Sequence, residues 1–412
     1  MSSDGLSTQP NVFQQLMLQW ERFAPYNAAQ FFTLQEPVDA DAIVRSFRQT
    51  VVSLGLQQIG QHPDSPLLQS TEPLESFITS KMNEAYAPGD SPLRAFVLRE
   101  GSLSHVGVVY RHIVADSASI RVVMRRWFEL LHDSAAQTPA FTPVTPMRER
   151  FGGLWRDHLF SLVREAATEV IRLSRIKQVR RLRDNDPRQP IAWKRIELGS
   201  ERIGPLVRYA KAKGVKVNDL FVAAAADACN LHLPHEESDT RRDLAIGTIV
   251  DTREAGEAVH SRFGLSLGVL QTVWRWQQLQ SWDATLAAAS AASESARRRG
   301  AGRSSELRIA AAVWHGRNMS NPELATFYRK RCPLAAGISN VNLNRDWPAV
   351  HHPAPLASYT RVSPLGPMLP IVFTPTTLGD RLDLGFTYRT KVVPEEVAGR
   401  VLASFIDRLR SL

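Results

Sequence analysis

A histidine and an aspartate, His112 and Asp116, stand four residues apart at the end of an apolar stretch. Residues 103–110 end in β-branched and aromatic side chains, typical of a buried strand, and residues 119–131 have apolar side chains at helical spacing. A histidine at such a strand end suits a general base, because the sheet holds its backbone while the ring moves one proton. The same spacing also fits a hydrogen-bonded core histidine followed by an aspartate that only caps the helix.

Segments elsewhere in the chain add an ordered pattern around this pair. Upstream we expect a strand, a turn and a helix start, then a second strand that leads toward His112. Downstream we expect a capped buried helix, a strand that ends in Arg253, and a further strand end. These segments are residues 31–43, 91–98, 217–225, 248–253 and 337–342.

Taken together, these segments resemble the superfamily of condensation domains and CoA-dependent acyltransferases over nearly the whole chain. That superfamily includes bacterial wax ester synthases and polyketide-associated acyltransferases, and its signature is H-H-x-x-x-D-G. The resemblance implies that His112 is the catalytic base. It also implies that Asp116 points away from the substrate and pairs with an arginine, for which Arg253 is the best-placed residue, to hold the catalytic loop.

Two positions depart from the signature, with Arg111 in place of its first histidine and Ser117 in place of its glycine. The Cβ of Ser117 obstructs the close backbone approach that a glycine allows. Arg111 would lower the pKa of His112 if it faced the same cavity. Strand alternation favours the opposite face for Arg111, since neighbouring side chains in a strand point to opposite sides.

The length of 412 residues suits two domains of about 200 residues each. The resemblance implies an α/β fold with two chloramphenicol-acetyltransferase-like halves, arranged as a V-shaped pseudo-dimer with the active site in a tunnel between them. A basic segment that becomes polar and proline-bearing, residues 175–190, is the candidate linker. We therefore expect an N-terminal half over residues 1–186 and a C-terminal half over residues 187–412, with loops at 143–146 and 295–305.

Composition indicates a soluble intracellular chain, with 43% hydrophobic and 22% charged residues and no apolar run approaching a membrane helix of about 20 residues. The first residues lack a signal-peptide pattern, and Cys229 and Cys332 suggest no disulfide framework, so we expect a cytoplasmic monomer. A net charge of +9 favours anionic partners such as coenzyme A or an acidic carrier protein. Nucleic acid is not expected, because the arginine clusters lack interleaved aromatic residues. The run Arg297, Arg298 and Arg299 is a candidate donor-docking site or, alternatively, a solvated helix face.

Other chemistries find little support. The pairs His232 with His235 and His351 with His352 have no completing ligands nearby, so no metal site is expected. A hydrolase triad of Ser117, His112 and Asp116 lacks the G-x-S-x-G elbow. No phosphate-binding loop or dinucleotide fingerprint occurs, and no tightly bound cofactor is expected.

The resulting hypothesis is acyl transfer from a CoA or carrier-protein thioester to a hydroxyl or amine, with His112 as general base. The resemblance makes Ser339 and Asn340 candidates to line the cavity or bind the oxyanion, alongside Ser117, although Asn340 also fits an ordinary turn residue. The plant motif D-F-G-W-G is absent, which favours the bacterial branch and a role in natural-product or lipid assembly. Two alternatives stay open: an inactive docking module that binds a carrier protein, and a thioester hydrolase.

Overall fold

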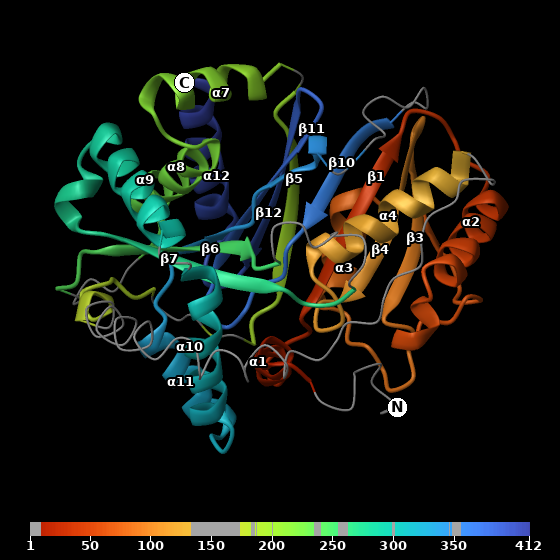
Figure 1. Ribbon diagram of the computed structural model, residues 1–412, viewed down its shortest axis with the longest axis horizontal. Helices are drawn as coiled ribbons and strands as arrows, with labels where there is room; N and C mark the ends of the chain where they lie inside the picture. Colours follow the sequence, from red (N-terminus) through yellow and green to blue (C-terminus); the bar gives the residue numbers. More distant parts are fainter. Residues whose placement is uncertain are drawn as a thin grey trace.

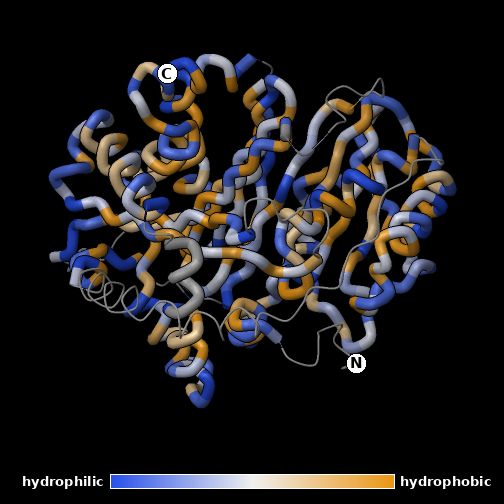
Figure 2. Tube along the Cα trace, in the orientation of Figure 1, coloured by the Kyte–Doolittle hydropathy of each residue, from blue (hydrophilic) through white to orange (hydrophobic). Residues whose placement is uncertain are grey.

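The computed structural model of the chain contains two β-sheets that lie side by side, with helices packed on them (Figure 1). The structure describes residues 10–132, 174–182, 186, 188–199, 201–234, 240–253, 263–298, 301–345, 347 and 356–412. Figure 2 shows hydrophobic residues concentrated along the strands and the inner faces of the helices. Among the described residues, none of the helices combines the length and the apolar character that a membrane crossing requires.

The first sheet has five strands in the order β10-β1-β4-β3-β2. The central strand β1 pairs antiparallel with both β10 and β4, and β2 pairs parallel with β3. The strand bounds are β1 Asn27–Leu34, β2 Leu68–Ser70, β3 Leu93–Glu100, β4 Leu103–Arg111 and β10 Leu356–Val362. The associated helices are α1 Val12–Glu21, α2 Ala40–Ser53, η1 Leu56–Ile59, α3 Leu74–Asn83 and α4 Ser117–His132. The strands expected around residues 31, 91–98 and 103–110 are therefore all present.

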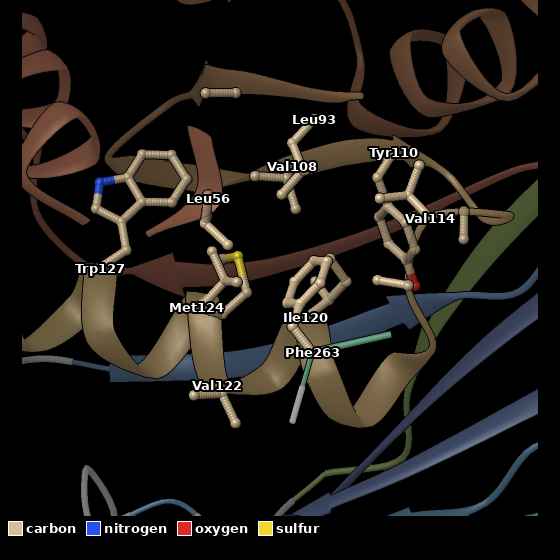
Figure 3. Packing of buried hydrophobic residues seen from close by; sticks show 14 of the residues in the cluster. Leu56, Leu93, Val108, Tyr110, Val114, Ile120, Val122, Met124, Trp127 and Phe263 are labelled. Carbon is tan, nitrogen blue, oxygen red and sulfur yellow. The ribbon is translucent and has the colours of Figure 1, made fainter. Parts of the chain in front are cut away.

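Helix α4 begins five residues after the candidate histidine and covers the sheet that carries it. Its side chains Ile120, Met124 and Trp127 recur at helical spacing, are fully buried, and point toward β4, whereas Val122 points to the other side of the helix (Figure 3). The apolar stripe holds α4 against the sheet through the hydrophobic effect. This packing fixes the direction in which the loop between β4 and α4 runs.

The second sheet has the strand order β5-β12-β11-β8-β6-β7, with β9 paired to β11. Its strands are β5 Ile191–Glu197, β6 Leu244–Asp251, β7 Leu267–Trp274, β8 Ala336–Ile338, β9 Val341–Asn342, β11 Ile371–Leu378 and β12 Arg381–Arg389. The helices of this half are α7 Ile203–Lys213, α8 Val217–His232, η2 Trp276–Leu279, α9 Trp282–Arg298, α10 Ala301–Gly316, α11 Asn321–Arg331, η3 Leu343–Arg345 and α12 Glu395–Arg410. The expected capped helix at 217–225 is α8, in which the Asp219 side chain accepts a hydrogen bond from the backbone N–H of Lys216.

Two glycines let strands approach closely where the site is built. A Cβ on Gly107 of β4 would lie 2.3 Å from Cβ of Phe31 in β1, and one on Gly385 of β12 would lie 2.5 Å from the carbonyl oxygen of Arg361 in β10. The second contact joins the two sheets, since β10 belongs to the first and β12 to the second. Any larger residue at either position would push the strands apart.

The expected loop at residues 295–305 is wrong. Helix α9 continues to Arg298 and α10 begins at Ala301. Most of the range that was expected to form a loop is therefore helical. The serines and arginines there suggest a loop by composition, but the alanines between them have the highest helix propensity. The loop expected at 143–146 lies outside the described residues. The division at residue 186 stays a prediction, and strand β10, from the C-terminal segment, lies in the first sheet.

Candidate active site

His112 follows the last residue of β4 and is anchored by its backbone. Its N–H donates to the carbonyl of Tyr26 at 3.0 Å, and its ring lies beside the rings of Tyr26 and Tyr110, with centroids 5.5 and 5.8 Å away. The Nδ1 atom is buried and has no hydrogen-bond partner on any other residue within the described part of the chain. A buried imidazole nitrogen without a partner is unusual for a purely structural histidine.

Burial sets the protonation state of this ring. Removal from water lowers the pKa of His112 to about 4, although its own backbone and the charge of Asp116 favour the protonated form. The imidazole is therefore neutral near pH 7. A neutral imidazole can accept a proton, which is what a general base requires.

Asp116 is fully buried, and its carboxylate is occupied by the protein itself. Its Oδ1 accepts from the N–H of Ser119 at 2.9 Å and thereby caps α4, while Oδ2 accepts from the N–H of Ser266 at 2.8 Å. The Nη2 of Arg253 lies 2.9 Å from Oδ2. The ion pair that the resemblance implies is present, and the carboxylate is committed to structural hydrogen bonds rather than to the His112 ring.

Arg253 connects this aspartate to residues of the C-terminal segment. Its Nη2 also donates to Oγ of Ser119 at 3.1 Å, and its Nη1 lies 3.1 Å from the carboxylate of Asp251. Burial alone would lower the pKa of Arg253, but the carboxylates of Asp116 and Asp251 raise it. The backbone of Gly264 both donates to Ser119 Oγ and accepts from it, each at 3.0 Å. The start of α4 is thus held by segments more than a hundred residues further along the chain.

Arg111 lies away from this arrangement. Its guanidinium forms a bidentate ion pair with Glu21 at the end of α1, with Nε and Nη2 at 2.9 and 2.6 Å from the carboxylate oxygens. Arg111 is not among the causes that shift the pKa of His112. The geometry agrees with the strand alternation that places Arg111 and His112 on opposite sides.

Ser117 is the first residue of α4 and has its hydroxyl in a polar network. Its Oγ accepts from Nε2 of Gln30 and from Nη1 of Arg361, each at 3.1 Å. Gln30 in turn accepts from the hydroxyl of Tyr359 at 2.6 Å. Because its oxygen is bonded to these groups, Ser117 does not form the nucleophile of a triad with His112.

The strand end at Ser339 and Asn340 meets the same network. The carbonyl of Ser339 accepts from Nη2 of Arg361, and its Oγ lies 3.4 Å from Nη1. Ser117 and Ser339, two of the residues expected to line the cavity, are therefore held by one guanidinium. The side-chain oxygen of Asn340 is buried and has no hydrogen-bond partner among the described residues.

Comparison with solved structures identifies this arrangement of sheets. The first condensation domain of the calcium-dependent antibiotic synthetase, in complex with a substrate analogue, matches with a TM-score of 0.68 at 15% identity, over 98% of this chain and 95% of that chain. The condensation domain of the Monacolin K polyketide synthase MokA matches with a TM-score of 0.67 at 12% identity, over 98% and 97%. The chain has the condensation-domain fold. No protein-family model and no curated protein sequence matches it.

The condensation-domain fold confirms the two-sheet α/β class that the resemblance implied. An epimerization domain from tyrocidine synthetase B also has this fold, with a TM-score of 0.64 at 12% identity over 98% of this chain and 96% of that chain. Since one fold carries more than one reaction, the chemistry must be argued from the site residues. The V-shaped arrangement and the tunnel stay predictions.

The remaining candidate residues are three arginines, 297–299, and four histidines. Arg297 and Arg298 are exposed at the end of α9, and Arg299 lies outside the described residues. His232 forms a hydrogen bond of 2.7 Å with Ser404, a structural contact, while His235, His351 and His352 lie outside the described residues. The described residues contain no group of three or more potential metal ligands.

The sequence-based reasoning missed Arg361, Gln30, Tyr359 and Ser119. Arg361 stands in the run Ser358-Tyr359-Thr360-Arg361-Val362, where an arginine within a strand of β-forming residues is a detectable signal. Its hydrogen-bond partners come from three other segments, so no local pattern could have named them.

Proposed function

We propose that this protein transfers an acyl group from a thioester to a hydroxyl or amine acceptor, with His112 as the general base. The observation that carries the proposal is the neutral imidazole, whose buried Nδ1 is bound by no other described residue, beside a loop held by the Asp116 and Arg253 ion pair. The condensation-domain fold supports it, because the solved relatives include condensation domains of peptide and polyketide synthetases.

In the proposed reaction the acceptor oxygen or nitrogen attacks the thioester carbonyl while the imidazole of His112 takes the acceptor's proton. The new bond joins the acceptor to the carbonyl carbon, and the carbon–sulfur bond then breaks. The departing thiolate receives the proton from the imidazolium, so the free imidazole is restored and no acyl-enzyme forms. A positioned base of this kind contributes on the order of 10²- to 10⁴-fold.

Other residues have supporting roles in the proposal. Asp116 and Arg253 hold the loop, and Ser339 and Asn340 line the space where the oxyanion develops. The unpartnered side-chain oxygen of Asn340 supports its assignment to a cavity that substrate fills. The exposed Arg297 and Arg298 support docking of an anionic donor, either coenzyme A or a carrier protein.

The test is mass spectrometry of the full chain incubated with acyl-CoA and acyl-carrier thioesters and a mixture of alcohols and amines. We expect acceptor-dependent ester or amide from the wild type and from His62→Ala, an exposed histidine far along the chain from the site. His112→Ala should yield none while keeping the wild-type melting temperature.

Three other results would overturn the proposal. Free acid released without any acceptor would indicate a thioester hydrolase. Carrier binding without any product from the wild type would indicate a docking module. Equal product from His112→Ala and wild type would remove His112 from the chemistry.

A further inference from the structure

Arg361 lies where the two sheets meet. It pairs in register with Gln30 of β1, and its carbonyl oxygen faces Gly385 of β12, whose missing side chain lets the strands approach. Its side chain is buried, with 2% of the residue exposed. The guanidinium therefore lies inside the molecule, at the junction.

The guanidinium joins three separate segments. Its Nε donates to Oγ1 of Thr376 in β11 at 3.1 Å, and its Nη1 donates to Oγ of Ser117 in α4 at 3.1 Å. Its Nη2 donates to the carbonyl of Pro375 at 3.2 Å and to that of Ser339. A planar guanidinium with its donors in fixed directions holds all these partners in one mutual geometry.

This cation has hydroxyl and carbonyl oxygens as its partners, and no carboxylate ion pair forms with it among the described residues. Burial, together with the neighbouring charge of Arg121, lowers the pKa of Arg361 to about 9, so the guanidinium stays charged at neutral pH. A buried charge without a countercharge is costly for stability. A merely stabilising role would be served better by an apolar residue, which points to a geometric use.

The hydrogen bond of Arg361 that bears on the geometry of the site is the one to Ser117. Asp116 is held by Arg253, and the next residue, Ser117, is held by Arg361, so two arginines from different segments hold consecutive residues of the loop that follows His112. The Ser117 hydroxyl provides the acceptor that a glycine at this position would lack. Ser117, which stands where the signature has glycine, thus has Arg361 as a hydrogen-bond partner in the structure.

Resting on the proposed function, we infer that Arg361 is a positioning residue that acts through the Ser117 hydroxyl to fix the start of α4, and with it the orientation of the His112 ring. The second polar partner of Ser117, Gln30, supports the same placement from β1. Because the guanidinium of Arg361 donates to several acceptors in fixed directions, a lysine ammonium group cannot replace it.

A double-mutant cycle tests the inference. Ser117→Gly removes the hydroxyl without adding bulk. Arg361→Lys keeps the positive charge but loses the planar guanidinium with its donors in fixed directions. If Arg361 acts through Ser117, each variant lowers kcat on the most active thioester of the panel about 10- to 100-fold, and the double variant is no slower than the worse single one. The matched control is Ser358→Ala, which removes a buried hydroxyl partner of Arg195 from the same strand and should keep wild-type kcat.

A second measurement keeps the inference separate from the proposed function. In protein labelled with ¹³C at the histidine Cε1, the His112 resonance is assigned by its loss in His112→Ala. We expect this resonance to shift or broaden in Ser117→Gly and Arg361→Lys and to stay in place in Ser358→Ala. A wild type without acyl transfer would overturn the proposed function, yet the resonance would still report on positioning. Multiplicative kcat losses, or an unmoved His112 resonance, would overturn the inference.

Discussion

Asp116 and Arg253 lie 137 positions apart in the sequence, and their side chains meet at 2.9 Å in the interior of the protein. The aspartate is completely buried and the arginine side chain is 5% exposed. The pair therefore ties the loop after His112 to the end of β6, and its carboxylate has no free position for chemistry. Under the proposed function we therefore expect the histidine, and not the aspartate, to be the reactive residue of the motif.

Breaking the buried pair should unfold the protein before it affects chemistry. Asp116→Asn leaves Arg253 without a countercharge on that side, which costs about 3 to 5 kcal/mol of unfolding free energy. Asp251→Asn removes the other carboxylate of Arg253, which is 43% exposed, and should cost less than about 1 kcal/mol. Urea denaturation of both variants measures the difference. An Asp116→Asn protein with normal stability but no activity would instead give Asp116 a direct catalytic role.

Acidification should affect activity and stability in the same direction. Burial places the pKa of His112 at about 4 in the folded chain, below its ordinary value of 6.5. The base is then active above that pKa, so kcat/KM should be level from about pH 6 upward and fall as the pH drops through about 4. Because the unfolded chain binds the proton more tightly, this group's contribution to stability is complete above pH 6.5 and is lost as the pH falls toward 4.

The pH dependence is checked by rate profiles and by denaturation at each pH. His112→Ala should lose the stability change that belongs to this group, while the exposed His62→Ala should keep it. A kinetic pKa near 6.5 in the free enzyme would mean that the ring is solvated and that burial does not set its protonation.

The close approach of β10 and β12 should make Gly385 intolerant of any side chain. Gly385→Ala places a Cβ against the carbonyl of Arg361, and we expect a loss of about 1 to 3 kcal/mol from overpacking. Gly399→Ala in α12 meets no atom within 4 Å and should stabilise the helix by up to about 1 kcal/mol. Thermal melting of the two alanine variants compares them, and equal melting temperatures would refute the close contact between β10 and β12.

Reversing the charge of the α9 end should weaken binding of an anionic donor. Arg297→Glu with Arg298→Glu should raise the KM for the thioester about tenfold at low ionic strength, and added salt should remove the difference. The matched control reverses Arg45 and Arg48, two exposed arginines of α2. Steady-state kinetics across salt concentrations measures the effect, and a KM that responds equally to both double variants would assign the change to net charge alone.

Local patterning predicted much of the fold. The alternation and aromatic content around Val108 and Tyr110, the helical stripe of Ile120, Met124 and Trp127, and the capped start of α8 each depend on neighbours in the chain. The prediction of a loop at 295–305 was wrong although it also used local sequence. Serine and arginine content suggested a loop where alanine propensity favours helix.

The candidate site, like the fold, has features that local sequence patterns predict and features that only tertiary contacts decide. The sequence by itself determined that His112 lies at the end of a strand and that Asp116 lies at the start of a helix, and it favoured opposite sides for Arg111 and His112, because strand and helix periodicity are local properties of the backbone. Only the tertiary structure decided that Nδ1 of His112 is buried and the ring neutral, and that Arg361 from β10 reaches Ser117 and Ser339. Burial and long-range hydrogen bonds depend on which distant strands become neighbours, and that choice is made by the packing of the whole core.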